Sequence, residues 1–218
     1  MRKNGFTLIE LMVGLPLSSL LMLTMVTLFK QVSHVGLNSS EDSEYESQME
    51  IGLLTIQRLI QNAGYGSGSQ DDIAIGTYNT KDAIFWRSAA AYSPDPTVAI
   101  DYQCHGFGIN ISTAGNRDIH RLLLLKASPC SGTTNLADED WQIEQTIATL
   151  KINPADNLLY TGDPVFEFSL STGECVPFGI SLGSLSGDVR VKVSGLRKYD
   201  YGVGNKERFV CLNNIKAP

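Results

Sequence analysis

An apolar run near the start of the chain restricts what the protein can fold into. Residues 6–29 read FTLIELMVGLPLSSLLMLTMVTLF and contain a single charged side chain, Glu10. A helix rises about 1.5 Å per residue, so this segment is long enough to cross a hydrocarbon core of roughly 30 Å. An ionised carboxylate in such a segment costs several kcal/mol unless it is paired, which marks Glu10 as a functional residue. Pro16 invites a kink in the same helix.

The residues on either side of the run allow three interpretations of it. Arg2 and Lys3 precede it, and the positive-inside rule places them in the cytoplasm and the rest of the chain outside. A secretory signal peptide has a similar layout, but here the apolar run is too long and no clear small-x-small cleavage site follows it. A plain signal anchor leaves both Glu10 and the junction between Gly5 and Phe6 unexplained.

The third interpretation rests on the stretch GFTLIEL at residues 5–11, which resembles the class III signal of type IV prepilins and type II secretion pseudopilins. The resemblance implies that residues 1–5 are a leader, that prepilin peptidase cuts between Gly5 and Phe6, and that the new amino group of Phe6 is methylated. It also implies that Glu10 is an assembly residue that pairs with this amino group on a neighbouring subunit. A subunit out of register would leave a buried charge without its partner.

Residues 30–64 are expected to continue the helix in amphipathic form. Apolar residues follow a helical spacing of three and four, and they are Tyr45, Met49, Leu53, Ile56 and Ile60. The helix is predicted to end near residue 62, with Gly64 as a left-handed cap. We interpret the acidic residues of its first part as a solvated face, with a partner-binding patch as the alternative; these are Glu41, Asp42, Glu44, Glu46 and Glu50. Ile51 and Leu54 point away from the apolar stripe and are candidate contacts to a neighbouring subunit.

The remaining residues, 65–218, are predicted to form a β-rich globular domain. Short β-rich runs such as AIFWRS, VAIDYQC, FGINIS and VFEFSLS alternate with turns rich in Pro, Gly, Asn and Asp. The segment VRVKVSGL alternates apolar and charged residues, which is typical of a half-exposed antiparallel strand. The predicted fold class is therefore α+β, with one long helix packed on an antiparallel sheet, as in pilins.

The four cysteines predict disulfides rather than a metal site. They show no CxxC or Cys/His ligand spacing, and they follow an export segment. Four cysteines allow three connectivities. Sequence order favours Cys104 with Cys130 and Cys175 with Cys211.

No motif of the chain predicts catalysis, a metal or a cofactor, so we do not expect an enzyme. GYGSGS at residues 64–69 fits neither a nucleophile elbow nor a nucleotide-binding loop. The three histidines lack the carboxylate pattern of a catalytic triad, and the acidic turns QDD and DEDW lack the spacing of an EF-hand. The net charge of −6 argues against a nucleic-acid surface. The DNA-binding alternative rests on four basic residues, Arg190, Lys192, Arg197 and Lys198.

The residues at the end of the predicted helix indicate a resemblance to a smaller group within this family. LLTIQRLIQNAGYG resembles PilW-type minor pilins, although SGSQ stands where that family commonly has a cysteine. The resemblance implies a single-pass protein of the inner membrane with a periplasmic domain, incorporated at or near the tip of an extracellular pilus. Its implied partners are prepilin peptidase, the major pilin, other minor pilins and the pilus assembly platform, with DNA or a host surface as further candidates. A J-type pseudopilin of type II secretion and a membrane-anchored periplasmic enzyme remain as alternatives.

Overall fold

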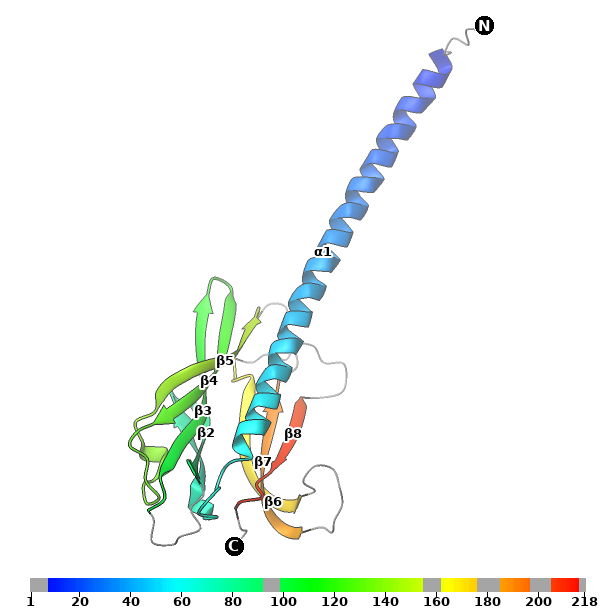
Figure 1. The fold of residues 1–218 in the computed structure, drawn as a ribbon. Coiled ribbons are helices and arrows are strands. Elements are labelled where there is room, and N and C mark those ends of the chain that lie inside the picture. Colours follow the sequence, from blue (N-terminus) through cyan, green and yellow to red (C-terminus); the bar gives the residue numbers. More distant parts are fainter. Residues whose placement is uncertain (1–7, 92–98, 155–161, 176–184, 197–204, 216–218) are drawn as a thin grey trace. The chain divides into compact units, whose positions relative to one another are not determined.

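The computed structural model describes residues 8–91, 99–154, 162–175, 185–196 and 205–215, with the side chains of residues 174, 175 and 185–188 left aside. The chain divides into two compact units, Met1–Glu44 and Tyr45–Pro218. The helix α1, Leu8–Ile60, begins in the first unit and ends in the second (Figure 1). The N-terminal part of α1 therefore belongs to the first unit. Its C-terminal part, from Tyr45, belongs to the same unit as the strands.

In the first unit, α1 continues through Pro16 without a break in its helical assignment. Its apolar side chains are exposed along the whole described part of the segment. The hydroxyl groups of Ser18, Ser19, Thr24 and Thr27 donate to backbone carbonyl oxygens three residues earlier in the helix, at 2.8–2.9 Å. These bonds satisfy the hydroxyl groups within the helix, which makes them compatible with an apolar surrounding.

The second unit contains two antiparallel sheets, where the sequence predicted one (Figure 1). The five-stranded sheet has the order β1-β2-β3-β4-β5, and the three-stranded sheet has the order β6-β7-β8. The first sheet comprises β1 (Ile73–Tyr78), β2 (Lys81–Ala89), β3 (Tyr102–Ala114), β4 (Arg117–Ala127) and β5 (Gln142–Ile152). The second comprises β6 (Phe166–Cys175), β7 (Leu185–Gly195) and β8 (Lys206–Cys211). Two short 3-10 helices, η1 (Gln70–Asp72) and η2 (Leu136–Asp138), precede β1 and β5.

The C-terminal part of α1 packs against both sheets, as its apolar stripe predicts. All five residues of that stripe are buried, and they share one core with inward-facing residues of the two sheets. One close approach is at Gly52, where a Cβ atom would lie 2.7 Å from Phe166 of β6 and 3.3 Å from Leu122 of β4. A glycine at this position therefore lets the helix lie close to both sheets.

Three side chains near the start of this buried half attach α1 to different strands. Tyr45 donates its hydroxyl hydrogen to the carbonyl oxygen of Leu196, just after β7, at 2.7 Å. The Oε1 atom of Gln48 accepts from the backbone N–H of Thr149 in β5 at 3.1 Å. Glu46 accepts from Lys206 of β8 at 2.9 Å. The helix is therefore bonded to both sheets within its first buried turn.

One sequence prediction about the strands was wrong, and one strand was missed. VAIDYQC and FGINIS were expected to be separate strands, but β3 runs continuously through Gly106 and Gly108. These glycines make room for aromatic rings, since a Cβ atom would lie 2.5 Å from Phe85 at Gly106 and 2.8 Å from Tyr78 at Gly108. The strand β1 was not predicted from the sequence at all.

The end of α1 also differs from the prediction. The helix ends at Ile60, and Gly64 has the expected positive φ of 73°. Its N–H, however, donates to the carbonyl oxygen of Arg87 in β2 at 3.0 Å instead of capping the helix. The next residue, Tyr65, accepts from the N–H of Ala89 at 2.8 Å. The turn after α1 therefore extends the ladder of β2.

Candidate functional site

The residues expected to be processed, Gly5 and Phe6, lie outside the described residues. Glu10 lies in the first turn of α1, and its side chain is exposed. Among the described residues, α1 is the single helix long and apolar enough to cross a membrane, by length and composition. The described part of the N-terminal segment is therefore an uncovered apolar helix that carries one carboxylate near its start.

Part of the acidic face of α1 is engaged within the domain, which corrects its interpretation as a merely solvated surface. Lys206 lies 2.9 Å from Glu46 and 2.7 Å from Glu50, and Arg208 lies 2.9 Å from Glu50. The hydrogen bond from Lys206 lowers the pKa of Glu50, against the opposing effect of burial. Burial lowers the pKa of Lys206, but its hydrogen bonds to Glu50 and Glu46 outweigh that effect and leave the pKa raised. Both shifts favour the charged forms that join α1 to β8.

Two of the four basic residues considered for DNA binding, Arg190 and Lys192, make contacts within the three-stranded sheet. Lys192 pairs with Glu207 at 2.6 Å. Arg190 donates to the hydroxyl of Ser171 at 3.0 Å, and its guanidinium lies 4.9 Å from the ring centre of Phe209. The other two members, Arg197 and Lys198, lie outside the described residues.

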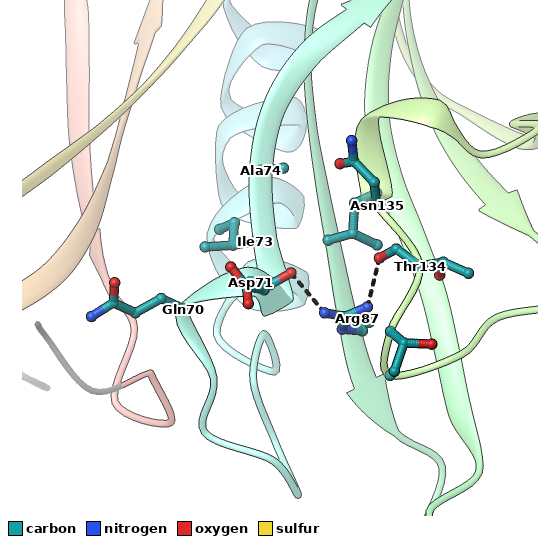
Figure 2. A pocket seen from close by; sticks show the side chains of 10 residues that line it. Gln70, Asp71, Ile73, Ala74, Arg87, Thr134 and Asn135 are labelled. Carbon is teal, nitrogen blue, oxygen red and sulfur yellow. Dashed lines mark hydrogen bonds between the residues drawn. The ribbon is translucent and has the colours of Figure 1, made fainter.

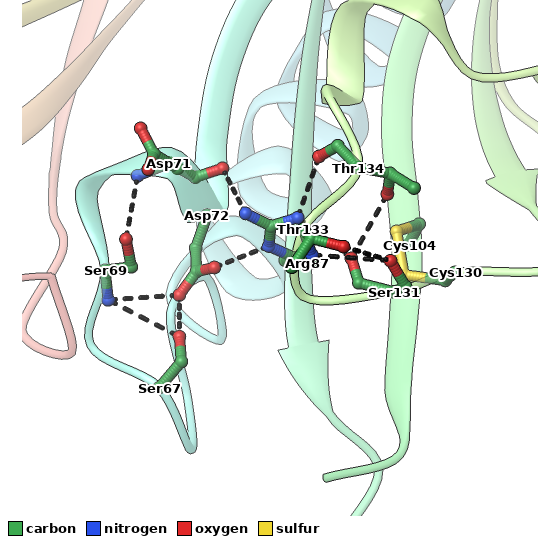
Figure 3. Close-up of polar contacts among 10 residues, drawn as sticks. All are labelled: Ser67, Ser69, Asp71, Asp72, Arg87, Cys104, Cys130, Ser131, Thr133 and Thr134. Atoms are coloured by element: carbon green, nitrogen blue, oxygen red, sulfur yellow. Dashed lines mark hydrogen bonds and ion pairs between the residues drawn. A yellow bond between two sulfur atoms is a disulfide. The ribbon is translucent and has the colours of Figure 1, made fainter.

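A buried ion pair that the sequence analysis missed joins β2 to η1. Arg87 of β2 and Asp72 of η1 have side chains that are each 2% exposed, with Nε and Oδ1 2.6 Å apart. The other nitrogens of Arg87 donate to the carbonyl oxygens of Asp71, Ser131 and Thr134 at 2.9–3.0 Å (Figure 3). The one sequence signal for this arrangement was a charged residue inside the apolar strand AIFWRS. Nothing in that signal identified its partner.

Asp72 also orders the connection that follows α1. Its second carboxylate oxygen accepts from the N–H of Ser69 at 3.2 Å and from the hydroxyl of Ser67. The side chain of Ser69 accepts in turn from the N–H of Asp71, which completes a capping box around η1. The turn GYGSGSQDD is therefore a fixed loop.

The disulfide between Cys104 and Cys130 is present, as sequence order predicted, with the two Cα atoms 5.6 Å apart. It attaches β3 to residues 128–141, the segment between β4 and β5 that we call the flap. The flap also packs on the outer face of the five-stranded sheet, where Trp141 stacks on Phe85 with ring centres 4.4 Å apart. Cys211 is disulfide-bonded too. The side chain of its predicted partner, Cys175, lies outside those described, so the second pairing stays a prediction.

A pocket of about 510 Å³ opens between η1 and the flap. Arg87 lies at its inner side, and Thr134 and Asn135 of the flap face Gln70 and Asp71 across it (Figure 2). The complete lining is Gln70, Asp71, Ile73, Ala74, Arg87, Gly132, Thr133, Thr134, Asn135 and Leu136. Polar side chains from two loops distant in sequence thus converge on one hollow.

Two of the three histidines lie in the five-stranded sheet. His105 lies 3.7 Å from Glu144, and burial lowers its pKa. His120 is fully buried in β4, and burial lowers its pKa to about 4. Within the described ranges, no group of three His, Cys, Asp or Glu side chains is placed to hold a metal ion.

Comparisons with known proteins add one finding, at the N-terminus. Residues 1–26 match the family model of the prokaryotic N-terminal methylation motif. Curated proteins and solved structures gave no match to the chain. The motif supports a type IV pilin-like protein that is processed by prepilin peptidase, which is the coarser part of the resemblance seen in GFTLIEL.

Proposed function

We propose that this chain is a minor pilin, a structural subunit that primes the assembly of a type IV pilus and is located at or near the filament tip. The observation that carries the proposal is the methylation motif at residues 1–26. In this proposal, prepilin peptidase cuts after Gly5 and methylates the amino group of Phe6. The role is structural, and no reaction is assigned to the chain itself.

The exposed apolar half of α1 supports insertion into the inner membrane before assembly and into the filament afterwards. Its apolar side chains have no cover within their unit, and its hydroxyl groups are satisfied by the helix backbone. Arg2 and Lys3 would stay in the cytoplasm, which places residues 45–218 in the periplasm. From there the subunit would join the major pilin and other minor pilins at the assembly platform.

Glu10 has a physical role in this proposal. The amino group created at Phe6 is positive, and Glu10 of one subunit pairs with this group on its neighbour. A charge in an apolar setting is costly without a partner, so this pair selects one axial register. A filament containing such a subunit would support adhesion, twitching motility or DNA uptake.

The first test is the mass and N-terminal sequence of the protein expressed with and without a prepilin peptidase. We expect a mature chain that starts at N-methyl-Phe6 when the peptidase is present. The variant Gly5→Ala should abolish this processing, whereas Gly14→Ala, also near the N-terminus, should leave it intact. An uncut chain, or a cut beyond residue 29, would contradict the proposal.

The second test separates processing from assembly. Glu10→Gln should be cut and methylated normally but should be lost from sheared filaments, because it removes the charge and keeps the shape. Glu41→Gln, the same change farther along α1, should be incorporated like the wild type. Normal incorporation of Glu10→Gln would refute the assembly role of Glu10.

A third test addresses the alternative of a minor pseudopilin, because type II secretion pseudopilins carry the same kind of motif. Deletion of the gene should reduce the number of surface pili and leave the secretion of folded exoproteins unchanged. The opposite result, normal piliation with blocked secretion, would assign the chain to a secretion pseudopilus.

A further inference from the structure

We propose that the pocket between η1 and the flap is a binding site for a neutral saccharide. Its volume of about 510 Å³ lies within the range of roughly 300–1,000 Å³ that small-ligand sites occupy. It lies wholly within residues 70–136, so it shares no residue with the segment proposed to be processed and assembled. The inference therefore goes beyond the proposed function and does not depend on it.

The charges of the lining disfavour an anionic ligand. Arg87 contributes the one cationic side chain of the pocket, and its charge is matched by Asp72 at 2.6 Å. Its guanidinium also donates to three carbonyl oxygens of the surrounding loops. Asp71 adds a carboxylate at the exposed side of the pocket. A phosphate, sulfate or carboxylate ligand would therefore meet a negative side chain and a cation that is already neutralised.

The hydrogen-bonding groups of the lining match a ligand rich in hydroxyl groups. An amide such as that of Gln70 and a hydroxyl such as that of Thr133 can each donate and accept more than one hydrogen bond, and the carboxylate of Asp71 accepts. The Thr133 hydroxyl also lies 3.2 Å from the hydroxyl of Ser131, which leaves it further bonding capacity. The side chains of Gln70, Thr133 and Asp71 are all exposed at the pocket. Ile73 and Ala74 add an apolar patch beside them. A sugar ring presents this combination, with hydroxyl groups around its rim and C–H groups on its faces.

Both walls of the pocket are fixed before any ligand arrives. The η1 wall is held by its capping box and by Asp72, and the flap wall is held by the disulfide to Cys104 and by Arg87 (Figure 3). A ligand that enters a fixed pocket spends less of its binding free energy on ordering loops. Buried ion pairs are often no more stabilising than apolar residues of the same size. Holding the two walls of the pocket in place therefore gives the pair between Arg87 and Asp72 a role beyond stability.

The experiment uses the full chain in phosphatidylcholine nanodiscs, because a maltoside detergent would itself present a sugar. The labelled particles are screened on an array of neutral oligosaccharides ending in galactose, glucose, mannose or N-acetylglucosamine, with sialylated and sulfated glycans as charged probes. The best neutral glycan is then titrated in solution. We expect saturable binding that is at least tenfold weaker in Asp71→Asn and in Thr133→Trp, which fills the pocket from an exposed position.

The matched control is Asp82→Asn, the same change on an exposed residue at the start of β2, near the β1–β2 turn and away from the pocket. It should bind like the wild type. Retention of the Cys104–Cys130 disulfide and an unchanged circular dichroism spectrum confirm that each variant is folded. The proposal is overturned if no neutral glycan binds, if charged glycans bind more tightly, or if Thr133→Trp binds normally. Measuring the uncut and the cut chain side by side keeps this result separate from that of the processing test.

Discussion

The charged side chain of Arg87 is buried, with 2% of it exposed. It is bonded to the carboxylate of Asp72 and to three backbone carbonyl oxygens. Replacing it by Met would leave Asp72 buried without its partner and three carbonyl oxygens without their donor. We expect Arg87→Met to lower the free energy of unfolding by about 3–5 kcal/mol. Denaturant unfolding of the detergent-solubilised chain, followed by near-ultraviolet circular dichroism, measures this change.

Two further variants show whether the loss comes from the unpaired charge. Arg121→Met removes an arginine that donates to the hydroxyl of Ser112 at a part-buried site, and it should cost less than about 1 kcal/mol. The double variant Asp72→Leu with Arg87→Met should recover part of the loss. A double variant that is less stable than Arg87→Met alone would contradict this explanation.

His120 gives the domain a predictable response to acid. Its pKa is lowered by burial from 6.5 to about 4, so the unfolded chain takes up the proton first as the pH falls. The free energy of unfolding should therefore decrease as the pH falls from 6.5 to 4. Below pH 4 this residue should cause no further decrease. At about 1.4 kcal/mol per pKa unit, the loss is on the order of 3 kcal/mol.

The measurement is a series of denaturant titrations from pH 7.5 to pH 3.5, on the wild type and on His120→Gln. Above pH 4.5, the free energy of unfolding of the variant should depend less on pH than that of the wild type. Both proteins should still lose stability at lower pH, where Glu50 gives up a charge that Lys206 stabilises. Identical slopes of the two proteins above pH 4.5 would show that His120 is not the group responsible.

At the scale of elements, Gly52 is a point of close contact between α1 and the two sheets. Alanine has a higher helix propensity than glycine, by about 1 kcal/mol, and would stabilise an isolated helix. Here its Cβ atom would lie 2.7 Å from Phe166, so we expect Gly52→Ala to destabilise the domain by roughly 1–3 kcal/mol. Gly36→Ala, a helical glycine with open space around it, should not destabilise the domain, and thermal unfolding distinguishes the two.

The elements also show which parts of the fold the sequence could predict. The stripe from Tyr45 to Ile60 was predicted because burial of one helix face repeats every three to four residues. The continuity of β3 was not, because Gly106 looks like a break until the ring of Phe85 is seen to fill the space beside it. Such a contact joins strands distant in sequence, and no local pattern contains it.

The same reasoning applies to the candidate sites. The motif around Gly5 and Phe6 is local, so it could be recognised directly. The pocket is assembled from η1 and the flap, which are about sixty residues apart in the chain, and its central residue Arg87 lies on a third element. Glu46 and Glu50 were assigned to a solvated face because their partners on β8 lie far along the sequence.

At the scale of the whole molecule, the Cys104–Cys130 disulfide closes a loop with a sequence separation of 26 residues. The double variant Cys104→Ala with Cys130→Ala should lower the free energy of unfolding by about 3 kcal/mol, because the unfolded chain gains conformational freedom. Substitution is preferable to a reducing agent, which would also open the disulfide of Cys211. A loss below about 0.5 kcal/mol would contradict this explanation from the entropy of the unfolded chain.

The first buried turn of α1 also has a mechanical consequence. Any pull on the helix from its N-terminal side reaches residues 45–218 at Tyr45, Glu46 and Gln48, which are bonded to the end of β7, to β8 and to β5. The load is therefore divided between the two sheets at its point of entry. Tension on the helix would therefore be shared by three side-chain attachments that end on both sheets.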